Sequence, residues 1–200
     1  MNTKQTIKLI EIAESNFILG SEKGNLALAI LRQRIFKSTK ILEISFEGIW
    51  GVDACFVRNS IASLAKMHCG DLGVMVSNVV NEDVFENLCY GFKAKEMPLF
   101  IKNTDGSGTC YAQLTKTQHQ VLECVYVKGQ TTTEQISKAL DKSAANVSGV
   151  MKKLLKQGHF LADKSAALTG GIEYAFTPYF KCKELKFESY GPVGKSYEQA

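Results

Sequence analysis

Residues 131–158 constrain the fold more than any other stretch, because their pattern predicts two short helices joined by a tight turn. Thr131 and Glu134 have the spacing of a capping box, which marks the start of the first helix. Asp141 and Lys142 then leave room only for a sharp reversal of the chain. We therefore expect a helical hairpin here.

The second helix of this hairpin is expected to begin after Ser143, whose hydroxyl group can cap it, and to end at Gly158. Its inward stripe is predicted to consist of Val147, either Val150 or Met151, and Leu154. Outside the stripe lie small polar residues at the front and lysines behind, namely Asn146, Ser148, Lys152, Lys153 and Lys156. Such a helix suits the major groove of DNA, because small side chains let its backbone approach the bases and lysines can meet phosphates. A helical hairpin with an ordinary solvated lysine face is the alternative.

The segments on either side of the hairpin extend this pattern. Residues 116–127 carry apolar side chains on one side and predict a further helix before it. Residues 159–179 predict a β-hairpin that turns at Thr169, Gly170 and Gly171. Helices followed by a glycine-turned ribbon form a winged helix, in which the ribbon rests on the DNA backbone beside the recognition helix.

The first half of the chain has a different pattern, in which strands alternate with helices. Predicted strands lie at residues 6–12, 40–46, 72–76 and 98–101, with a short extended piece at 17–19, and predicted helices lie at 21–37, 54–68 and 82–90. This alternation indicates βαβ units in a mixed, largely parallel sheet with helices on one face. The helix predicted at 21–37 carries Leu26, Ile30, Leu31 and Ile35 at the spacing of one face, which is expected to point inward. Trp50 is expected to close the end of the core, and the alternative is that it anchors a partner protein.

Residues 103–108, NTDGSG, are the clearest break in the chain, because every one of them favours turns. We interpret them as a hinge between domains. The expected organisation is an α/β domain at residues 1–103, a linker at 104–112, a winged helix-turn-helix domain at 113–182 and a tail at 183–200. The expected fold class is therefore α/β plus α+β.

Charge and composition narrow the function classes. The net charge is +4, and the whole excess lies after residue 112, where 12 Lys and Arg face 8 Asp and Glu. A basic bias confined to one half fits a polyanionic partner there. The six cysteines include no C-x-x-C pair, so neither a zinc site nor a disulfide framework is expected. No segment approaches the roughly 20 apolar residues of a membrane span, and the N-terminus lacks a signal-peptide pattern, so we expect a cytoplasmic protein.

The second half of the chain also carries a family resemblance. The residues that carry it are Leu114, Thr115, Gln118, Val121, Leu122, Thr131, Thr132, Thr133, Glu134, Gln135, Ile136, Leu140, Asp141, Lys142, Ser143, Asn146, Val147, Ser148, Leu154, Gln157, Gly158, Gly170 and Gly171. This run resembles a MarR-like winged helix-turn-helix, which implies binding to double-stranded DNA. It departs from that pattern at Asp141, where such turns often carry glycine, and in having no arginine in the second helix or the ribbon.

Residues 21–103 carry a second resemblance. It rests on the segments KILEISFEGI at 40–49, VDACFV at 52–57 and GVMVSN at 73–78. They resemble an STAS-like domain, which implies a module for dimerisation or for binding a regulatory protein or signal. In anti-sigma-factor antagonists with this fold, a serine that is phosphorylated stands where this chain has Ala54. A phosphorylation switch is therefore not expected there.

Together these patterns predict a DNA-binding transcriptional regulator. In the expected homodimer, two winged helices engage successive half-sites of the duplex. The residues expected to contact DNA are Thr131, Thr132 and Thr133 at phosphate, Ser143, Asn146 and Ser148 at bases, and Lys152, Lys153 and Lys164 at phosphates. The alternative is a protein-interaction adaptor whose winged helix is a docking surface. The sequence shows no catalytic constellation, metal-ligand set or cofactor motif, so we expect neither an enzyme nor a bound cofactor.

Overall fold

The larger sheet organises the first half of the molecule. The computed structural model describes residues 3–166 and 172–188, and within them this sheet has the strand order β1-β3-β5-β6-β7-β11. The strands are β1 (Thr3–Lys8), β3 (Thr39–Ser45), β5 (Gly73–Ser77), β6 (Leu99–Lys102), β7 (Gly108–Tyr111) and β11 (Leu185–Glu188). Neighbouring strands are parallel except for β6 and β7, which are antiparallel. The predicted mixed, largely parallel sheet is therefore confirmed.

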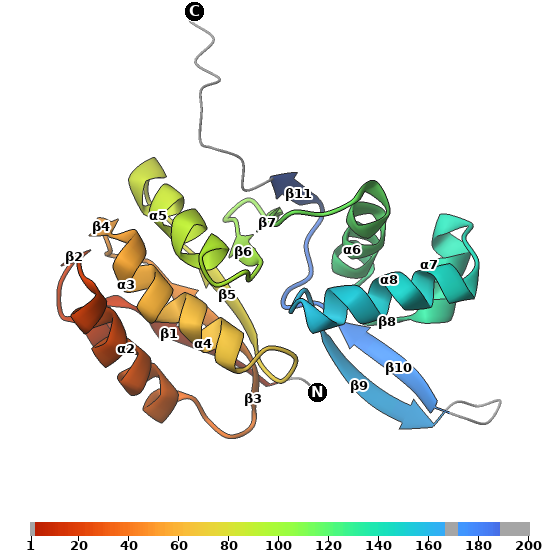
Figure 1. Ribbon diagram of the computed structural model, residues 1–200, viewed down its shortest axis with the longest axis horizontal. Helices are drawn as coiled ribbons and strands as arrows, with labels where there is room; N and C mark the ends of the chain where they lie inside the picture. Colours follow the sequence, from red (N-terminus) through yellow and green to blue (C-terminus); the bar gives the residue numbers. More distant parts are fainter. Residues whose placement is uncertain (1–2, 167–171, 189–200) are drawn as a thin grey trace, which may run out of the picture.

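Helices cover one face of this sheet (Figure 1). They are α2 (Ser21–Arg34), α3 (Ala54–Asn59), α4 (Ile61–Met67) and α5 (Glu82–Lys93), and their inward residues belong to the first hydrophobic core. Asp53 caps α3 by accepting a hydrogen bond from the Phe56 N–H group at 2.6 Å. The helix predicted at 54–68 is interrupted at Ser60. The Ser60 hydroxyl donates to the Phe56 carbonyl four residues earlier at 2.6 Å, a bond that bends helices.

The N-terminal strand lies earlier in the chain than the sequence predicts. β1 ends at Lys8, and the short helix α1 (Ile10–Ala13) follows it. Leu9 and Ile12 are both buried, and they are three residues apart, which is the spacing of one helix face. The alternation of apolar residues across 6–12 therefore spans the end of a strand and the start of a helix.

α2 packs through its small residues. Leu26 is 63% exposed, so the expectation that it faces inward is wrong. Gly24 and Ala27 are buried instead, and a Cβ atom on Gly24 would lie 2.8 Å from the Phe56 carbonyl oxygen. Glycine is required at this close approach of α2 to α3, and a search for large apolar side chains misses such a contact.

Trp50 is 64% exposed, so the expectation that it closes the core is wrong. It precedes β4 (Gly51–Val52), which pairs with β2 (Phe17–Ile18) in a small parallel sheet. The ring of Phe17 lies so close to Gly51 that a Cβ atom there would be 2.6 Å from it. Phe17 and Trp50 are therefore both exposed at this corner, and the Phe17 ring lies over Gly51.

The remaining elements form a winged helix-turn-helix lobe. Its elements are α6 (Lys116–Lys128), β8 (Thr131–Thr132), α7 (Thr133–Leu140), α8 (Ala144–Lys156), β9 (Leu161–Ala166) and β10 (Ile172–Thr177). β10 pairs with both β8 and β9 in antiparallel fashion. The turn expected at Thr169 to Gly171 lies outside the described residues. The three helices and the hairpin thus occur in the predicted order.

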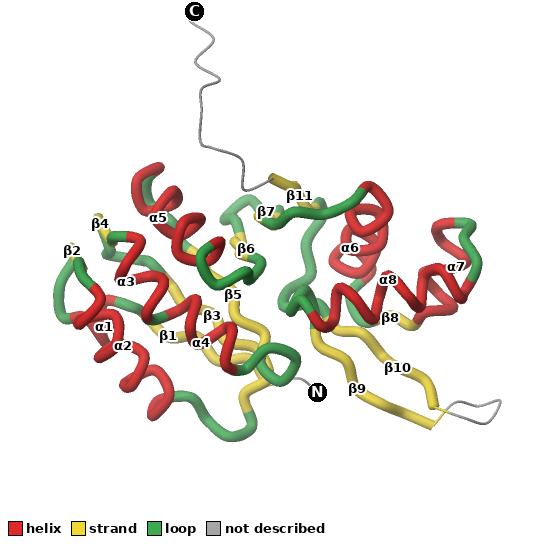
Figure 2. The backbone as a smooth tube through the Cα atoms, in the orientation of Figure 1, coloured by secondary structure: helices red, strands yellow, loops and turns green. Residues whose placement is uncertain are grey.

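The lobe is inserted into the larger sheet. Residues 108–111, which lie in the predicted linker, form β7, and residues 185–188, which lie in the predicted tail, form β11. The NTDGSG segment closes the hairpin between β6 and β7, where the Asn103 N–H group donates to the Ser107 carbonyl at 3.0 Å. Figure 2 shows the chain leaving the sheet after β7 and returning to it as β11. Turn-forming residues specify a chain reversal but not whether it separates two domains or two strands.

The sheet and the lobe share a second hydrophobic core. The sheet contributes Ile41, Met75, Phe100 and Cys110 to it. Phe100 stacks on Tyr126 with ring centroids 5.0 Å apart and meets Tyr179 edge-on at 5.2 Å. The Tyr126 hydroxyl donates to the His159 carbonyl at 3.0 Å, and the Tyr179 hydroxyl donates to the Gly158 carbonyl at 2.5 Å. The end of α8 is therefore tied to the rings that fill this core.

Two further features concern membranes and metals. In the part of the chain that the structure describes, every helix is too short or too polar to cross a membrane. The same residues include no group of three or more His, Cys, Asp or Glu side chains placed to hold a metal ion.

Candidate nucleic-acid interface

α7 begins one residue later than predicted. Thr132 caps it, because its hydroxyl accepts from the Gln135 N–H group at 3.4 Å and the Gln135 side chain accepts from the Thr132 N–H group at 3.0 Å. Thr131 does not form the expected box with Glu134, because its buried hydroxyl donates to the Gln135 side-chain oxygen instead. α7 ends at Asp141, which has left-handed backbone angles (φ 48°, ψ 51°) that aspartate tolerates better than most residues.

α8 begins at Ser143, as predicted. The Ser143 hydroxyl accepts a hydrogen bond from the Asn146 N–H group at 3.3 Å. The buried stripe of α8 consists of Val147, Met151 and Leu154. Met151 rather than Val150 thus completes the inward face, which packs on the second core.

The C-terminal end of α8 is held against the sheet. Gly158 has a φ of +76°, and the N–H groups of Gly158 and His159 donate at 3.1 Å to carbonyl groups of the last turn, which is a Schellman cap. A Cβ atom on Gly158 would lie 2.9 Å from Met97 and 3.0 Å from Cys69. The Cys69 thiol is also 3.6 Å from the Lys156 carbonyl oxygen. Glycine is therefore required here by both its backbone angle and its neighbours.

The outward face of α8 is exposed along its length. It consists of Ala145, Gly149, Lys152 and Lys156, which recur every three or four residues and which we call the outward stripe. A Cβ atom on Gly149 would meet nothing within 4 Å, and α8 contains no Asp or Glu. Ala145 and Gly149 are not among the contact residues predicted from the sequence, and Lys156 is predicted only to lie outside the inward stripe. In the sequence, Ala145 and Gly149 can be recognised as two small residues, four positions apart, on the side of the helix opposite the apolar stripe.

The polar residues predicted to read bases do not share one side of α8. At 100° per residue, Asn146 and Ser148 lie about 160° apart around the helix axis. Asn146 and Lys153 border a shallow cavity of about 390 Å³ whose other wall includes Thr115 and Gln118 at the start of α6. The structure thus brings Asn146 and Lys153 together and places Ser148 on the opposite flank.

The three threonines predicted to meet phosphate have different environments. Thr131 is 3% exposed, and its hydroxyl donates to the Gln135 side-chain oxygen at 3.0 Å. The Thr131 hydroxyl is therefore buried and already paired, so it does not face a phosphate in this conformation. Thr132 and Thr133 are half-buried at the start of α7, where their contact with DNA stays a prediction.

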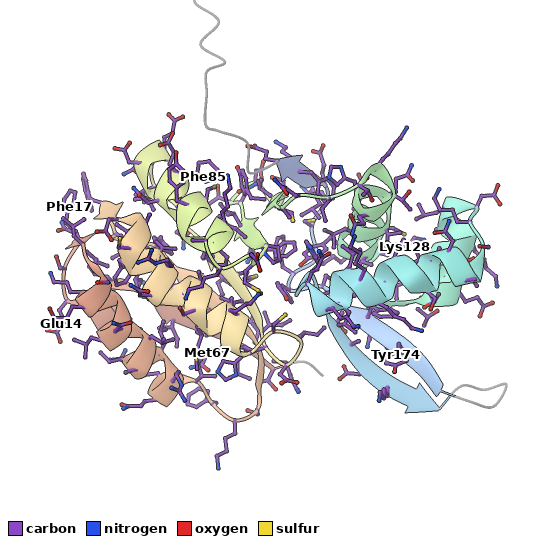
Figure 3. The ribbon with its side chains drawn as sticks, viewed as in Figure 1. Glu14, Phe17, Met67, Phe85, Lys128 and Tyr174 are labelled. Carbon is purple, nitrogen blue, oxygen red and sulfur yellow. The ribbon has the colours of Figure 1, made fainter. Side chains whose placement is uncertain are left out.

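The predicted wing residue Lys164 lies exposed on β9. Its ammonium group is 5.9 Å from the ring centroid of Tyr174, its cross-strand neighbour on β10, at a distance suited to a cation–π interaction. Figure 3 labels Tyr174 on this hairpin. Asp163 is also exposed, and it points to the other face of the ribbon because side chains alternate along a strand. The side chains of Lys164 and Asp163 therefore lie on opposite faces of the ribbon.

Comparison with known proteins agrees with this geometry in the lobe. Residues 114–159 match the model of the MarR family. The matched segment contains α6, β8, α7 and α8, and so includes the outward stripe. No curated protein and no solved structure matches the chain. The resemblance of residues 21–103 to an STAS-like domain stays a prediction, whereas the winged helix-turn-helix lobe is MarR-like.

Proposed function

We propose that the chain is a transcriptional regulator that binds double-stranded DNA with α8 in the major groove. The observation that carries this proposal is the outward stripe, an exposed helix face without acidic residues on a MarR-like lobe. Ala145 and Gly149 leave the α8 backbone free to approach base edges. Lys152 and Lys156 follow on the same face and neutralise phosphates.

Asn146 is the principal base-reading residue in this proposal. It is exposed in the first turn of α8, and its side chain carries the donor and acceptor that pair with an adenine edge. The Ser143 hydroxyl accepts the capping bond and keeps its proton to donate to a base or phosphate. Ser148, on the opposite flank, contacts the other wall of the groove.

The phosphate contacts surround this reading face. Lys153 lies beside Asn146, and Lys164 extends from the wing. Thr132 and Thr133 stand at the N-terminus of α7, where backbone N–H groups and the helix dipole favour an anion. These contacts fix the register of the protein on the duplex and do not read its sequence.

We also propose that the first half of the chain pairs two copies, which supplies two recognition helices for a two-fold site. Its exposed apolar patch consists of Phe17, Trp50 and Val80. Two hydrogen bonds of the Trp50 backbone hold these residues close together. The Trp50 N–H group donates to the carbonyl of Asn16, which precedes Phe17, at 2.8 Å, and the Trp50 carbonyl accepts from the side chain of Asn81, which follows Val80, at 2.9 Å. Phe17 and the wing residue Tyr174 lie at opposite ends of Figure 3, so pairing through the patch leaves the wings free.

The test of DNA binding is a fluorescence anisotropy titration with a random-sequence duplex at about 50 and 200 mM salt. We expect binding that weakens steeply with salt. Lys152→Ala should weaken binding to every sequence and reduce the salt slope by about 0.9. Lys23→Ala, an exposed lysine of α2, is the matched control and should change neither quantity. Absence of binding at low salt would refute the proposal and favour the adaptor function.

The test of pairing is the dependence of molecular mass on concentration, measured by sedimentation equilibrium. We expect a dimer for the unchanged chain and a shift toward monomer in Trp50→Ala. A chain that stays monomeric, or a dimer that Trp50→Ala leaves intact, would contradict the proposed role of the patch. The DNA titration does not depend on this result.

A further inference from the structure

The cations of the first half of the chain are unevenly distributed. Residues 23–42 contain five Lys and Arg residues and no Asp or Glu, although residues 1–112 as a whole carry 12 of each sign. Of these five, Arg32, Lys37 and Lys40 are exposed and form no ion pair with the residues that the structure describes. The helix dipole accounts for Arg32 in the last turn of α2, but not for the two lysines, which follow the helix.

These three cations line one hollow of about 370 Å³ at the amino ends of β3 and β5. His68, at the end of α4, and Asp71, in the loop that follows, contribute to its other side. Asp71 is the single acid among the described residues that line the hollow, so three cations and one anion leave a net charge of +2 with His68 neutral. A concave surface of one sign raises the local concentration of an oppositely charged partner, here a polyanion.

The loop that carries Lys37 is held in place by Gln5 of β1. The Gln5 side-chain oxygen accepts from the Phe36 N–H group at 3.0 Å and from the Thr39 hydroxyl at 2.7 Å. The Gln5 amide group donates to the Arg34 carbonyl at 2.8 Å. The loop is therefore ordered before a partner arrives, so that binding costs less conformational entropy.

The hollow adjoins the C-terminal end of α8. Cys69 follows His68 in the chain, and its thiol is 3.6 Å from the Lys156 carbonyl oxygen, so the loop after α4 lies beside that end of α8 (Figure 1). The outward stripe from Gly149 to Lys156 is about 10 Å long, at 1.5 Å per residue. This length is close to the major-groove width of about 12 Å, so a duplex whose groove holds the stripe has a phosphate strand near the hollow.

We propose that the hollow binds the sugar-phosphate backbone beside the groove that α8 occupies, so that the sheet half of the chain also contacts DNA. This inference rests on the proposed function of α8. Lys37 and Lys40 neutralise phosphates, and the planar guanidinium group of Arg32 binds a phosphate through two hydrogen bonds. Such contacts extend the length of duplex that is bound and add affinity without reading its sequence.

The test is a fluorescence anisotropy titration of the full chain with a random-sequence duplex of about three helical turns, at about 50 and 200 mM salt. The double variant Lys37→Ala/Lys40→Ala should lower the salt slope by about 1.8, so that the loss of affinity over this range becomes roughly twelvefold smaller. The matched control is Lys23→Ala/Arg58→Ala, which removes the same charge from exposed positions of α2 and α3 outside the hollow. Its slope should equal that of the unchanged chain.

The outcomes separate this inference from the proposed function. An unchanged chain that does not bind DNA at low salt overturns both. If that chain binds and Lys37→Ala/Lys40→Ala keeps its salt slope, only the role of the hollow is overturned. An equal fall in slope for Lys23→Ala/Arg58→Ala also overturns it, because overall charge then explains the effect. Circular dichroism checks the fold of each variant, and Lys37→Gln, with an expected fall in slope of about 0.9, replaces a double variant that does not fold.

Discussion

Replacing Gly149 by leucine is expected to stabilise the fold and to impair DNA binding. Gly149 lies in the interior of α8, and a side chain there meets open space, so leucine fits without a clash. Leucine is favoured over glycine within a helix by roughly 0.8 kcal/mol, which corresponds to a rise in Tm of about 2–3 °C for a chain of this size. In the proposed complex the same side chain holds the α8 backbone away from the base edges. We therefore expect DNA affinity to fall by roughly tenfold or more.

Two measurements separate these effects. Thermal unfolding followed by circular dichroism reports the change in Tm, and fluorescence anisotropy with a duplex reports the affinity. Ala29→Leu places the same side chain on an exposed position of α2 and should leave the affinity unchanged. If Gly149→Leu raised the Tm and bound DNA as tightly as the unchanged chain, the outward stripe would not enter the groove, and the reasoning would be wrong.

Two further predictions concern base reading and acid stability. Asn146→Ala should lower the discrimination between a selected duplex and a scrambled one by about 1–3 kcal/mol in a competition titration, and an unaltered preference would remove Asn146 from the reading face. His159 is buried, so it stays neutral in the fold with a pKa of about 3, whereas the unfolded chain binds a proton below pH 6.5. The protonation of His159 therefore leaves the free energy of unfolding unchanged above pH 6.5 and lowers it by roughly 1.4 kcal/mol per pH unit as the pH falls from 6.5 toward 3. Urea unfolding at several pH values should show this slope, and His159→Phe should remove it; a slope that persists in the variant would assign it to other groups.

The local elements of the site follow from the sequence because their signals are local. Ser143 predicts the start of α8, and Gly158 predicts its end, since each residue satisfies or permits a specific backbone geometry. The inward stripe follows from the helical period. Asp141 in the turn is also explained by its tolerance of the left-handed region.

Features that depend on tertiary contacts were harder to predict. Thr131 satisfies the spacing of a capping box as well as Thr132 does, and only the burial of Thr131, whose hydroxyl donates to Gln135, decides between them. The NTDGSG segment has the composition of a linker and of a hairpin turn alike. The role of residues 185–188 in β11 depends on a partner strand that lies far earlier in the chain. Trp50 is exposed beside the pair formed by β2 and β4, a placement that no periodicity encodes.

The insertion between β7 and β11 determines how the sheet and α8 are connected. These two strands are adjacent and parallel, so the chain leaves the sheet at Tyr111 and returns at Leu185, which lies beside Gly108, about 10 Å away along the strand direction. The lobe is fixed further by Phe100, which the rings of Tyr126 and Tyr179 contact from the other side of the interface. A flexible linker would let the lobe rotate freely, whereas this arrangement requires any rotation to disturb a buried aromatic contact. We therefore expect any coupling between the sheet and α8 to run through packed side chains at the end of α8, where Met97 and Cys69 leave no room for a Cβ atom on Gly158.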